Sequence, residues 1–519
     1  MQPDAAPLKS GCDPDEVGLS VLRAAGKDSA AARVALGPRE LLLASTVLVI
    51  AAMVIGPVTD FDYWWHVQTG RWILVHHRLP GHDLYTYTAA GHPWTDHEYL
   101  TEVLMWLLQS RLGLAAVSVA FGLVTVLGFV LLMRTAELRR PWCVVLGPGL
   151  VLAALAGMPV WGARPQMITF ALACLELWWL QRYLAGAGRG ILWLPLVMVL
   201  WANLHGGWVI AFVFLGLAML SEFMRWVADT PRREHLGRAW RLGVVGLLSA
   251  IAVAGTPNGL GLYLYPLRTQ GSTAQQRFIA EWQTPNLHEV TFLPFVALLL
   301  LLVVGLSLRR PRLFDLLLAV TTLAMALFSL RHIPLFVAAT TPVLVSSWSA
   351  ALQPARERLR VWRGPIGASP ALTATTAVAT ALIAATICIS IARSEERQDQ
   401  LLRGLYPVAA VDRLMAGPAA CDRIFNDYGW GGYLIDRLSA DPRRRTFIFG
   451  EADVMGDALI YRWKDIFQVG PDWQANLDRS RADCVLVPPD SPLAGALATR
   501  PNWRLAYEDR VAVLYVRRS

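Results

Sequence analysis

The sequence predicts a mainly α-helical membrane protein that carries a small α/β domain after its last hydrophobic segment. Of the 519 residues, 55% are hydrophobic and only 17% are charged, and the mean hydropathy is +0.41. A soluble domain averages about 25% charged residues. Several apolar runs of roughly 18–20 residues have the length that crosses a bilayer. After residue 392 these runs end, and short strand-like segments alternate with polar turns.

Three regions follow from this pattern. Residues 1–37 mix Ala, Gly, Asp and Arg without periodicity and are expected to be a disordered cytoplasmic tail. Residues 38–392 form a helical membrane domain, and its first outer loop covers residues 58–113. Residues 393–519 form an extracytoplasmic α/β domain. About eleven spans are expected, at 39–57, 114–133, 142–160, 167–184, 191–205, 208–225, 242–256, 291–308, 313–330, 332–348 and 371–391.

The distribution of arginine predicts the orientation in the membrane. Arginines gather in every second loop between apolar runs, for example at 309–312 and 356–363. Cytoplasmic loops carry such an excess, so the N-terminus is expected in the cytoplasm and the C-terminal domain on the outer face. The location expected is a bacterial cytoplasmic membrane. Because the charge of +8 lies in these short loops, it does not indicate nucleic-acid binding.

The C-terminal region is expected to alternate strands with helices, which is typical of a small α/β domain. Strands are expected at 424–426, 446–449, 484–487 and 511–516, and helices at 432–438 and 493–499. Cys421 and Cys484 are the only cysteines of this region. On an outer face they can form a disulfide; two free buried thiols are the equal alternative.

Candidate catalytic residues follow the first span. Asp60 and Asp62 flank one residue, and Trp64, Trp65 and His66 come next. Two carboxylates at this spacing can share a divalent cation such as Mg²⁺ or Mn²⁺, or one can act as a base that the other orients. We therefore take Asp60, Asp62 and His66 as candidate catalytic residues and both aspartates as candidate metal ligands. Helix capping beside an interfacial tryptophan belt is the alternative.

A second acidic cluster, Asp96, His97 and Glu98, opens a helical stretch that continues through Glu102. Acidic residues also favour the first turn of any helix because they complement its dipole. Function and capping are therefore equal alternatives for this cluster. If both ends of the loop fold back on one site, these acids converge with Asp60 and Asp62.

Outer arginines are the candidates for binding a phosphate. Arg164, Arg331 and the adjacent His332 lie in outer corners, against the general charge bias. The planar guanidinium fork suits phosphate oxygens. The alternative is an arginine that reaches toward lipid headgroups.

Substrate contacts are expected from two further segments. Asn203 and His205 lie beside a Gly-Gly pair at a span end, where glycine permits a close approach. Glu281 and Trp282 belong to a long outer loop, 257–290, that can cover a cleft. Helix packing is an equal reading of the first segment. For the corner at 428–433 and for Glu451, Asp453 and Asp457, packing and turn formation are favoured over function.

The layout resembles the C-type (GT-C) membrane glycosyltransferases. The shared features are an Asp-x-Asp motif in a long first outer loop, many spans and a C-terminal outer α/β domain. This superfamily includes protein mannosyltransferases, aminoarabinose transferases and catalytic subunits of oligosaccharyltransferases. The segments 60–66, 163–166, 203–207 and 428–433 also look like a group of bacterial membrane proteins without assigned function. The sequence lacks the Trp-Trp-Asp-Tyr-Gly motif of oligosaccharyltransferases, to which residues 427–430 are only partly similar.

The resemblance implies an enzyme that moves a hexosyl or pentosyl group from a polyprenyl-phosphate-type lipid to a glycan, lipid or protein acceptor. Asp60 or Asp62 would then act as the base or hold a metal, and Arg164 and Arg331 would neutralise the phosphate. Two alternatives remain. One is a non-catalytic envelope assembly protein on the same scaffold. The other is a lipid or ion transporter, which the absence of an internal repeat and the position of the acids in a loop disfavour.

Overall fold

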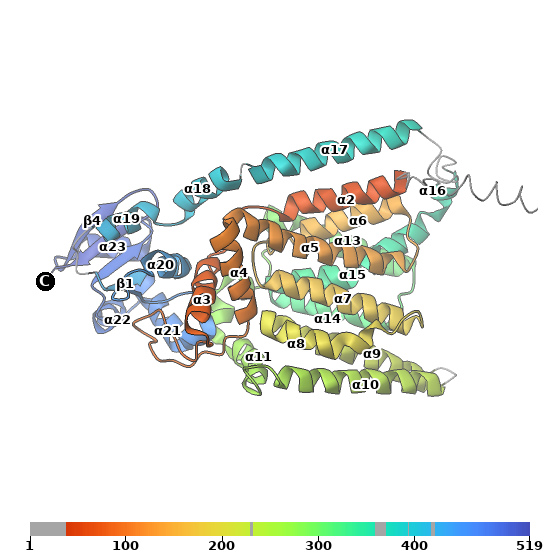
Figure 1. Ribbon diagram of the computed structural model, residues 1–519, viewed down its shortest axis with the longest axis horizontal. Helices are drawn as coiled ribbons and strands as arrows, with labels where there is room; N and C mark the ends of the chain where they lie inside the picture. The colour runs from red at the N-terminus through yellow and green to blue at the C-terminus, as the bar shows by residue number, and fades with distance from the viewer. Residues whose placement is uncertain (1–37, 229–231, 359–369, 393, 417–420, 519) are drawn as a thin grey trace, which may run out of the picture.

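The computed structural model describes residues 38–518 apart from 229–231, 359–369, 393 and 417–420. The tail predicted to be disordered, 1–37, lies outside the described residues. The helices form an elongated bundle, and the small sheet domain lies beyond one end of it (Figure 1). The segment between α2 and α5 lies at that same end (Figure 1).

Every one of the predicted spans coincides with a helix of the bundle. By length and composition alone, five helices of the described chain can cross a membrane: Leu114–Glu137, Gly206–Ala228, Arg233–Ala254, Val290–Leu308 and Leu330–Ala351. The number of crossings therefore stays a prediction. The bundle helices are α2 (Pro38–Val54), α5 (Leu114–Glu137), α6 (Cys143–Ala156), α7 (Gln166–Leu184), α8 (Leu194–Leu204), α9 (Val209–Ala228), α10 (Arg232–Ala254), α13 (Leu293–Leu308), α14 (Leu313–Phe328), α15 (Ile333–Ala351) and α17 (Pro370–Ala392).

Helix α15 is the best-buried element of the bundle and positions one wall of the site. All its residues from Ile333 to Ser347 are buried. Proline in its first turn suits a helix start, because the missing N–H has no partner there and the φ angle is already helical. The short 3₁₀ turn η5 (Leu330–His332) precedes it. Arg331 and His332 therefore lie directly before the first turn of a rigid helix.

The outer segment predicted as a loop contains two helices, α3 (Tyr63–His76) and α4 (Tyr99–Leu112). Helix α4 is the stretch predicted after Glu98, whereas a helix after Asp62 was expected only in the capping alternative; Asp62 precedes α3 but its side chain forms no capping hydrogen bond. They cross closely at Gly70, where a methyl group would lie 2.1 Å from the carbonyl oxygen of Glu102. Only glycine permits this approach. The crossing brings His66, one turn before Gly70, next to the side chain of Glu102.

The C-terminal domain is built on a five-stranded sheet in the order β2-β1-β3-β5-β4. Strand β1 is parallel to β2 and β3, and β5 is antiparallel to β3 and β4. Strand β2 is shorter than predicted, and the edge strand β4 was not predicted. The strands are β1 (Arg423–Asn426), β2 (Arg445–Thr446), β3 (Cys484–Val487), β4 (Trp503–Glu508) and β5 (Val513–Arg517), and the helices are α19 (Val408–Ala416), α20 (Gly431–Leu438), α21 (Ala452–Phe467), α22 (Trp473–Ser480) and α23 (Pro492–Ala498).

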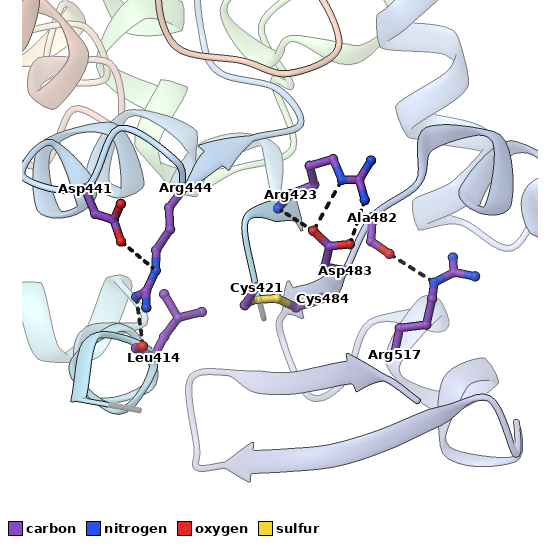
Figure 2. The surroundings of a disulfide bond; sticks show 9 residues. All are labelled: Leu414, Cys421, Arg423, Asp441, Arg444, Ala482, Asp483, Cys484 and Arg517. Atoms are coloured by element: carbon purple, nitrogen blue, oxygen red, sulfur yellow. Dashed lines mark hydrogen bonds and ion pairs between the residues drawn. A yellow bond between two sulfur atoms is a disulfide. The ribbon is translucent and has the colours of Figure 1, made fainter. Parts of the chain in front are cut away.

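Cys421 and Cys484 form a disulfide that joins the approach to β1 to the start of β3 (Figure 2). Their Cα atoms are 5.5 Å apart. Both residues are fully buried. Beside them Arg423 Nη2 lies 3.0 Å from Asp483 Oδ1, so an ion pair links the same two strands. Of the two alternatives open from the sequence, the structure has the disulfide.

Replacing both Cys421 and Cys484 with alanine is expected to destabilise the C-terminal domain by about 3–4 kcal/mol, because the bond closes a long loop. Its two cysteines are 63 residues apart. Unfolding of the purified protein in denaturant, followed by tryptophan fluorescence, measures the change. Cys388→Ala removes an exposed free thiol and is the control. Equal midpoints for the double variant and the control contradict this expectation.

Candidate active site

A cavity of about 300 Å³ lies where the bundle meets the C-terminal domain. It is bounded by α3, the first turns of α7, α9 and α15, the start of α21, and the segment that holds α11 (Gly261–Gly271) and α12 (Thr273–Phe278). Most of the site residues predicted from the sequence line it: Asp62, His66, His97, Glu98, His205, Glu281, Trp282, Arg331 and His332. The structure therefore brings together residues that are up to 270 positions apart.

Asp62 lies on the cavity wall just before α3. Its Oδ1 atom accepts a hydrogen bond of 3.2 Å from Trp65 Nε1. Gly450 of the C-terminal domain faces it so closely that a methyl group there would lie 1.5 Å from Asp62 Oδ1. Burial, with the carboxylates of Asp60 and Glu281, raises the pKa of Asp62 to about 7. A carboxyl group with this pKa can exchange a proton at neutral pH.

Asp60 does not line the cavity, although the sequence made both aspartates candidate catalytic residues. Arg164 holds both oxygens of Asp60, with Nε 2.8 Å from Oδ2 and Nη2 3.3 Å from Oδ1. Arg164 also pairs with Glu281. Its guanidinium is thus bound by two carboxylates and joins three segments. Arg164 therefore holds the loop in place. It does not line the cavity, although the sequence made it a candidate for binding a phosphate.

The C-terminal region holds the loop from the other side. The amide of Gln398, in α18 (Ser394–Leu405), accepts from Val58 N at 2.8 Å and donates to Val58 O at 2.9 Å. The hydroxyl of Tyr406 donates to Asp60 O at 3.3 Å. A side-chain amide that satisfies both backbone groups of one residue fixes that residue in place. The position of Asp62 therefore depends on both domains.

His66, Glu98 and Glu102 form the one group of possible metal ligands in the described part of the chain, with ligand atoms within 4.8 Å of one another. His66 Nδ1 lies 3.1 Å from Glu102 Oε1 and 3.6 Å from Glu98 Oε1. Burial raises the pKa of both glutamates well above the ordinary value. The Oε2 atom of Glu102 is buried without a hydrogen bond. A cation would satisfy these groups. Neither Asp60 nor Asp62, the metal ligands expected from the sequence, is among them.

The bundle side of the cavity carries the positive charge. Arg331 stacks over the ring of Trp282, with its Cζ atom 4.6 Å from the ring centroid. Among the described residues no carboxylate forms an ion pair with Arg331. His332 Nδ1 donates to Met325 O at 3.3 Å. The guanidinium charge of Arg331 is therefore available to a ligand in the cavity, whereas that of Arg164 is already paired.

Asn203 and Asp96 take supporting positions, whereas His97 lines the cavity and packs against a neighbouring ring. Asn203 is not on the wall, and its Nδ2 atom donates to Val199 O at 2.6 Å. Asp96 is buried behind the wall and accepts from Glu98 N at 3.3 Å. His97 stacks on Tyr265 with ring centroids 3.9 Å apart. In the corner at 428–433, Tyr433 packs on Tyr406, 4.8 Å away between ring centroids, so this corner contributes to packing.

Three acidic residues of the site were missed or set aside. Glu102 lies four positions after Glu98, and this spacing puts both on one face of a helix. The sequence therefore contained a pattern from which Glu102 could have been predicted as a site residue. Glu451 and Asp453 line the cavity from the start of α21, although their sequence context favoured a turn. Burial above all raises the pKa of Glu451 well above its ordinary value, and Asp453 adds to this.

No protein-family model and no curated protein matches the chain. Its fold is similar to that of the archaeal oligosaccharyltransferase AglB from Archaeoglobus fulgidus, solved with an inhibitory peptide and a dolichol-phosphate. The TM-score is 0.51 at 11% identity, over 86% of this chain and 69% of that chain. This likeness confirms the predicted resemblance to the GT-C membrane glycosyltransferases at the level of fold.

Two further solved structures are less similar. An Archaeoglobus fulgidus oligosaccharyltransferase tethered to an acceptor peptide has a TM-score of 0.46 and 12% identity, over 86% of this chain and 69% of that one. The arabinofuranosyltransferase AftD from Mycobacteria has a TM-score of 0.45 and 15% identity, over 93% of this chain and 40% of that one.

Proposed function

We propose that the protein is a membrane glycosyltransferase that moves a sugar from a polyprenyl-phosphate-type lipid to an envelope acceptor. One observation carries this proposal. A cavity at the end of the bundle is lined by buried acids, among them Asp62 and Glu98. It is also lined by Arg331, which forms no ion pair with a carboxylate among the described residues. Such a cavity separates a base from an anion site, which transfer from a phosphate-linked sugar requires.

The remaining lining supports a lipid-linked donor. Apolar side chains line the bundle side beside Arg331: Val160, Met167, Phe170, Ile210, Val213 and Leu335. They suit the first units of a prenyl chain, while Arg331 meets its phosphate. The AglB structure of similar fold was solved with a dolichol-phosphate.

Asp62 is the proposed base, because it is the aspartate of the pair that lines the cavity. It would take the proton of an acceptor hydroxyl as the hydroxyl attacks the sugar carbon and the phosphate leaves. A divalent cation, when bound, would supply positive charge to the leaving phosphate. His66, Glu98 and Glu102 would hold it. A donor set of one imidazole and two carboxylates suits Mn²⁺ better than Mg²⁺, which prefers oxygen ligands alone.

The proposed location is a bacterial cytoplasmic membrane, with the N-terminus in the cytoplasm and the cavity on the outer side. The Cys421–Cys484 disulfide supports an oxidising compartment for the C-terminal domain. The loop with Asp62 lies at the same end of the bundle as that domain (Figure 1). Both features agree with the orientation expected from the arginine distribution.

Two measurements on the purified protein test the proposal. Mass spectrometry of the extracted lipids is expected to detect a co-purified polyprenyl phosphate. Arg331→Ala is expected to weaken binding of added polyprenyl phosphate by about tenfold or more, because a charged hydrogen-bond partner of the phosphate is lost. Arg331→Lys keeps the charge but not the bidentate fork, so its loss should be smaller.

Arg182→Ala is the matched control, because this arginine lies near the end of α7, where it stacks on Trp178 and does not line the cavity. If wild type binds no polyprenyl phosphate, the proposed function is wrong. Binding without sugar transfer in the presence of donor and Mn²⁺ would favour the non-catalytic assembly protein on the same scaffold.

A further inference from the structure

A chain of hydrogen bonds ends on the cavity histidine His205. Trp201 Nε1 donates to Thr169 Oγ1 at 2.9 Å. Thr169 Oγ1 lies 2.8 Å from His205 Nδ1. The backbone N–H of Gly207 donates to the same nitrogen at 3.0 Å. Trp201 and Thr169 are buried, and His205 is only 8% exposed.

These partners fix which ring nitrogen of His205 carries the proton. A backbone N–H and an indole N–H can only donate. Because Gly207 N donates to Nδ1, this nitrogen must present a lone pair. With Nδ1 bare, the bond between Thr169 and His205 can only be donated by the threonine hydroxyl, whose oxygen still accepts from Trp201. In a neutral imidazole with a bare Nδ1, the proton is on Nε2.

The neutral form is favoured for the same reason, since a protonated ring would turn an Nδ1–H toward two donors. Burial of the ring also disfavours its charged form. Nε2 forms no hydrogen bond with any residue that the structure describes. Because His205 lines the cavity, Nε2–H is the polar group it offers to a ligand.

We propose that Thr169, Trp201 and Gly207 lock His205 as the neutral Nε2–H tautomer, so that His205 is a fixed hydrogen-bond donor to a phosphate oxygen of the lipid-linked substrate. Thr169 and Trp201 are then positioning residues, and His205 contacts the substrate. This inference rests on the proposed function for the identity of the ligand. It assigns His205 neither the role of a base nor that of a metal ligand, because both need a lone pair directed into the cavity.

The ligand oxygen follows from what surrounds His205. Arg331 lines the same cavity as His205. The carboxylates that line the cavity belong instead to the outer wall and to the segment at Glu281. A donor N–H beside a guanidinium suits an anionic oxygen that accepts from both. A neutral sugar hydroxyl would form weaker hydrogen bonds with these two donors than a phosphate oxygen does.

Gly207 is required by the same geometry. A methyl group at position 207 would lie 2.5 Å from Thr169 Oγ1 and 2.8 Å from His205 Nδ1. It would therefore separate the threonine from the histidine. The Gly-Gly pair was read from the sequence as a close approach to a ligand or to another helix; in the structure Gly207 makes its close approach to the side chains that orient His205.

The test measures binding of a polyprenyl monophosphate without sugar to the full chain in detergent, so that no transfer is needed. His205→Ala is expected to weaken binding about ten- to a hundredfold, the range for a hydrogen bond to a charged group. His205→Gln keeps an N–H donor near the position of Nε2 and should bind within about threefold of wild type. Equal losses in the two variants would overturn the proposal, since glutamine replaces a donor but not a base.

The positioning residues have their own variants. Thr169→Val keeps the shape but loses the hydroxyl, and it should weaken binding severalfold, whereas Thr169→Ser should bind like wild type. In the His205→Ala background, Thr169→Val should have no further effect, because threonine acts through the histidine. Additive losses, or wild-type binding by Thr169→Val, overturn the positioning role. If wild type itself binds no polyprenyl phosphate, the proposed function fails; if wild type binds and His205→Ala binds equally, only this inference fails.

Discussion

Replacing Asp62 with asparagine is expected to lower the rate of sugar transfer by about 10²–10⁴-fold, the usual contribution of one general base. Asparagine keeps the shape of the side chain and its hydrogen bond from Trp65, but it cannot take a proton. Binding of the lipid donor should change little, because Arg331 and not Asp62 is the proposed contact of the phosphate. Single-turnover transfer with a purified lipid-linked sugar measures the rate, and thermal unfolding checks that the variant is folded.

The pH dependence of the same reaction provides a second readout. Burial, with Asp60 and Glu281, raises the pKa of Asp62 to about 7. A base works in its deprotonated form, so transfer by wild type should increase as the pH rises through about 7 and then level off. The residual activity of Asp62→Asn should lack this rise.

Two comparisons separate catalysis from support. Asp60→Asn removes a charge from the buried pair with Arg164, so it should lower the unfolding temperature as well as the rate. Asp478→Asn changes an exposed carboxylate in the C-terminal domain and should affect neither. If Asp62→Asn transfers sugar at the wild-type rate, Asp62 is not the base.

The helices of the bundle could be predicted because each is a long apolar run, and the length and composition of such a run predict a helix without any knowledge of distant contacts. Helix α3 could not, because most of its first turns are buried on all sides and its residues show no amphipathic period. Strand β4 was missed because most of its residues are not buried. Only its first residue, Trp503, is fully buried, so the strand lacks the apolar alternation that a half-buried strand shows.

The candidate site could be predicted as a set of polar residues at the ends of apolar runs, where ionisable groups favour a functional interpretation over capping. The sequence could not show which of these residues form ion pairs with one another. Asp60 and Asp62 look equivalent along the chain, yet Arg164, 104 positions after Asp60, holds Asp60 and leaves Asp62 on the cavity wall. Glu451 carries no local signal at all, since it reaches the site through the docking of a separate domain.

Replacing Gly450 with alanine is expected to lower the rate of sugar transfer at least about 100-fold, as far as a loss of the base itself. The added methyl carbon would lie 1.5 Å from Asp62 Oδ1 and 2.5 Å from Asp62 Cγ, and no pair of non-bonded atoms can be that close. Either Asp62 turns away from the cavity, or the start of α21 moves and takes Glu451 with it. The measurement is single-turnover transfer, together with binding of polyprenyl phosphate, which should persist through Arg331.

Gly495→Ala is the matched control, because it adds the same methyl group to α23 of the same domain, where nothing lies within 4 Å. It should be as active as wild type. A Gly450→Ala variant with the wild-type rate would show that the C-terminal domain does not press on Asp62 during transfer. The expected loss, in contrast, means that Gly450 holds the base in place, although it lies 388 positions away and has no ionisable group. The cavity would then be active only when both domains are docked.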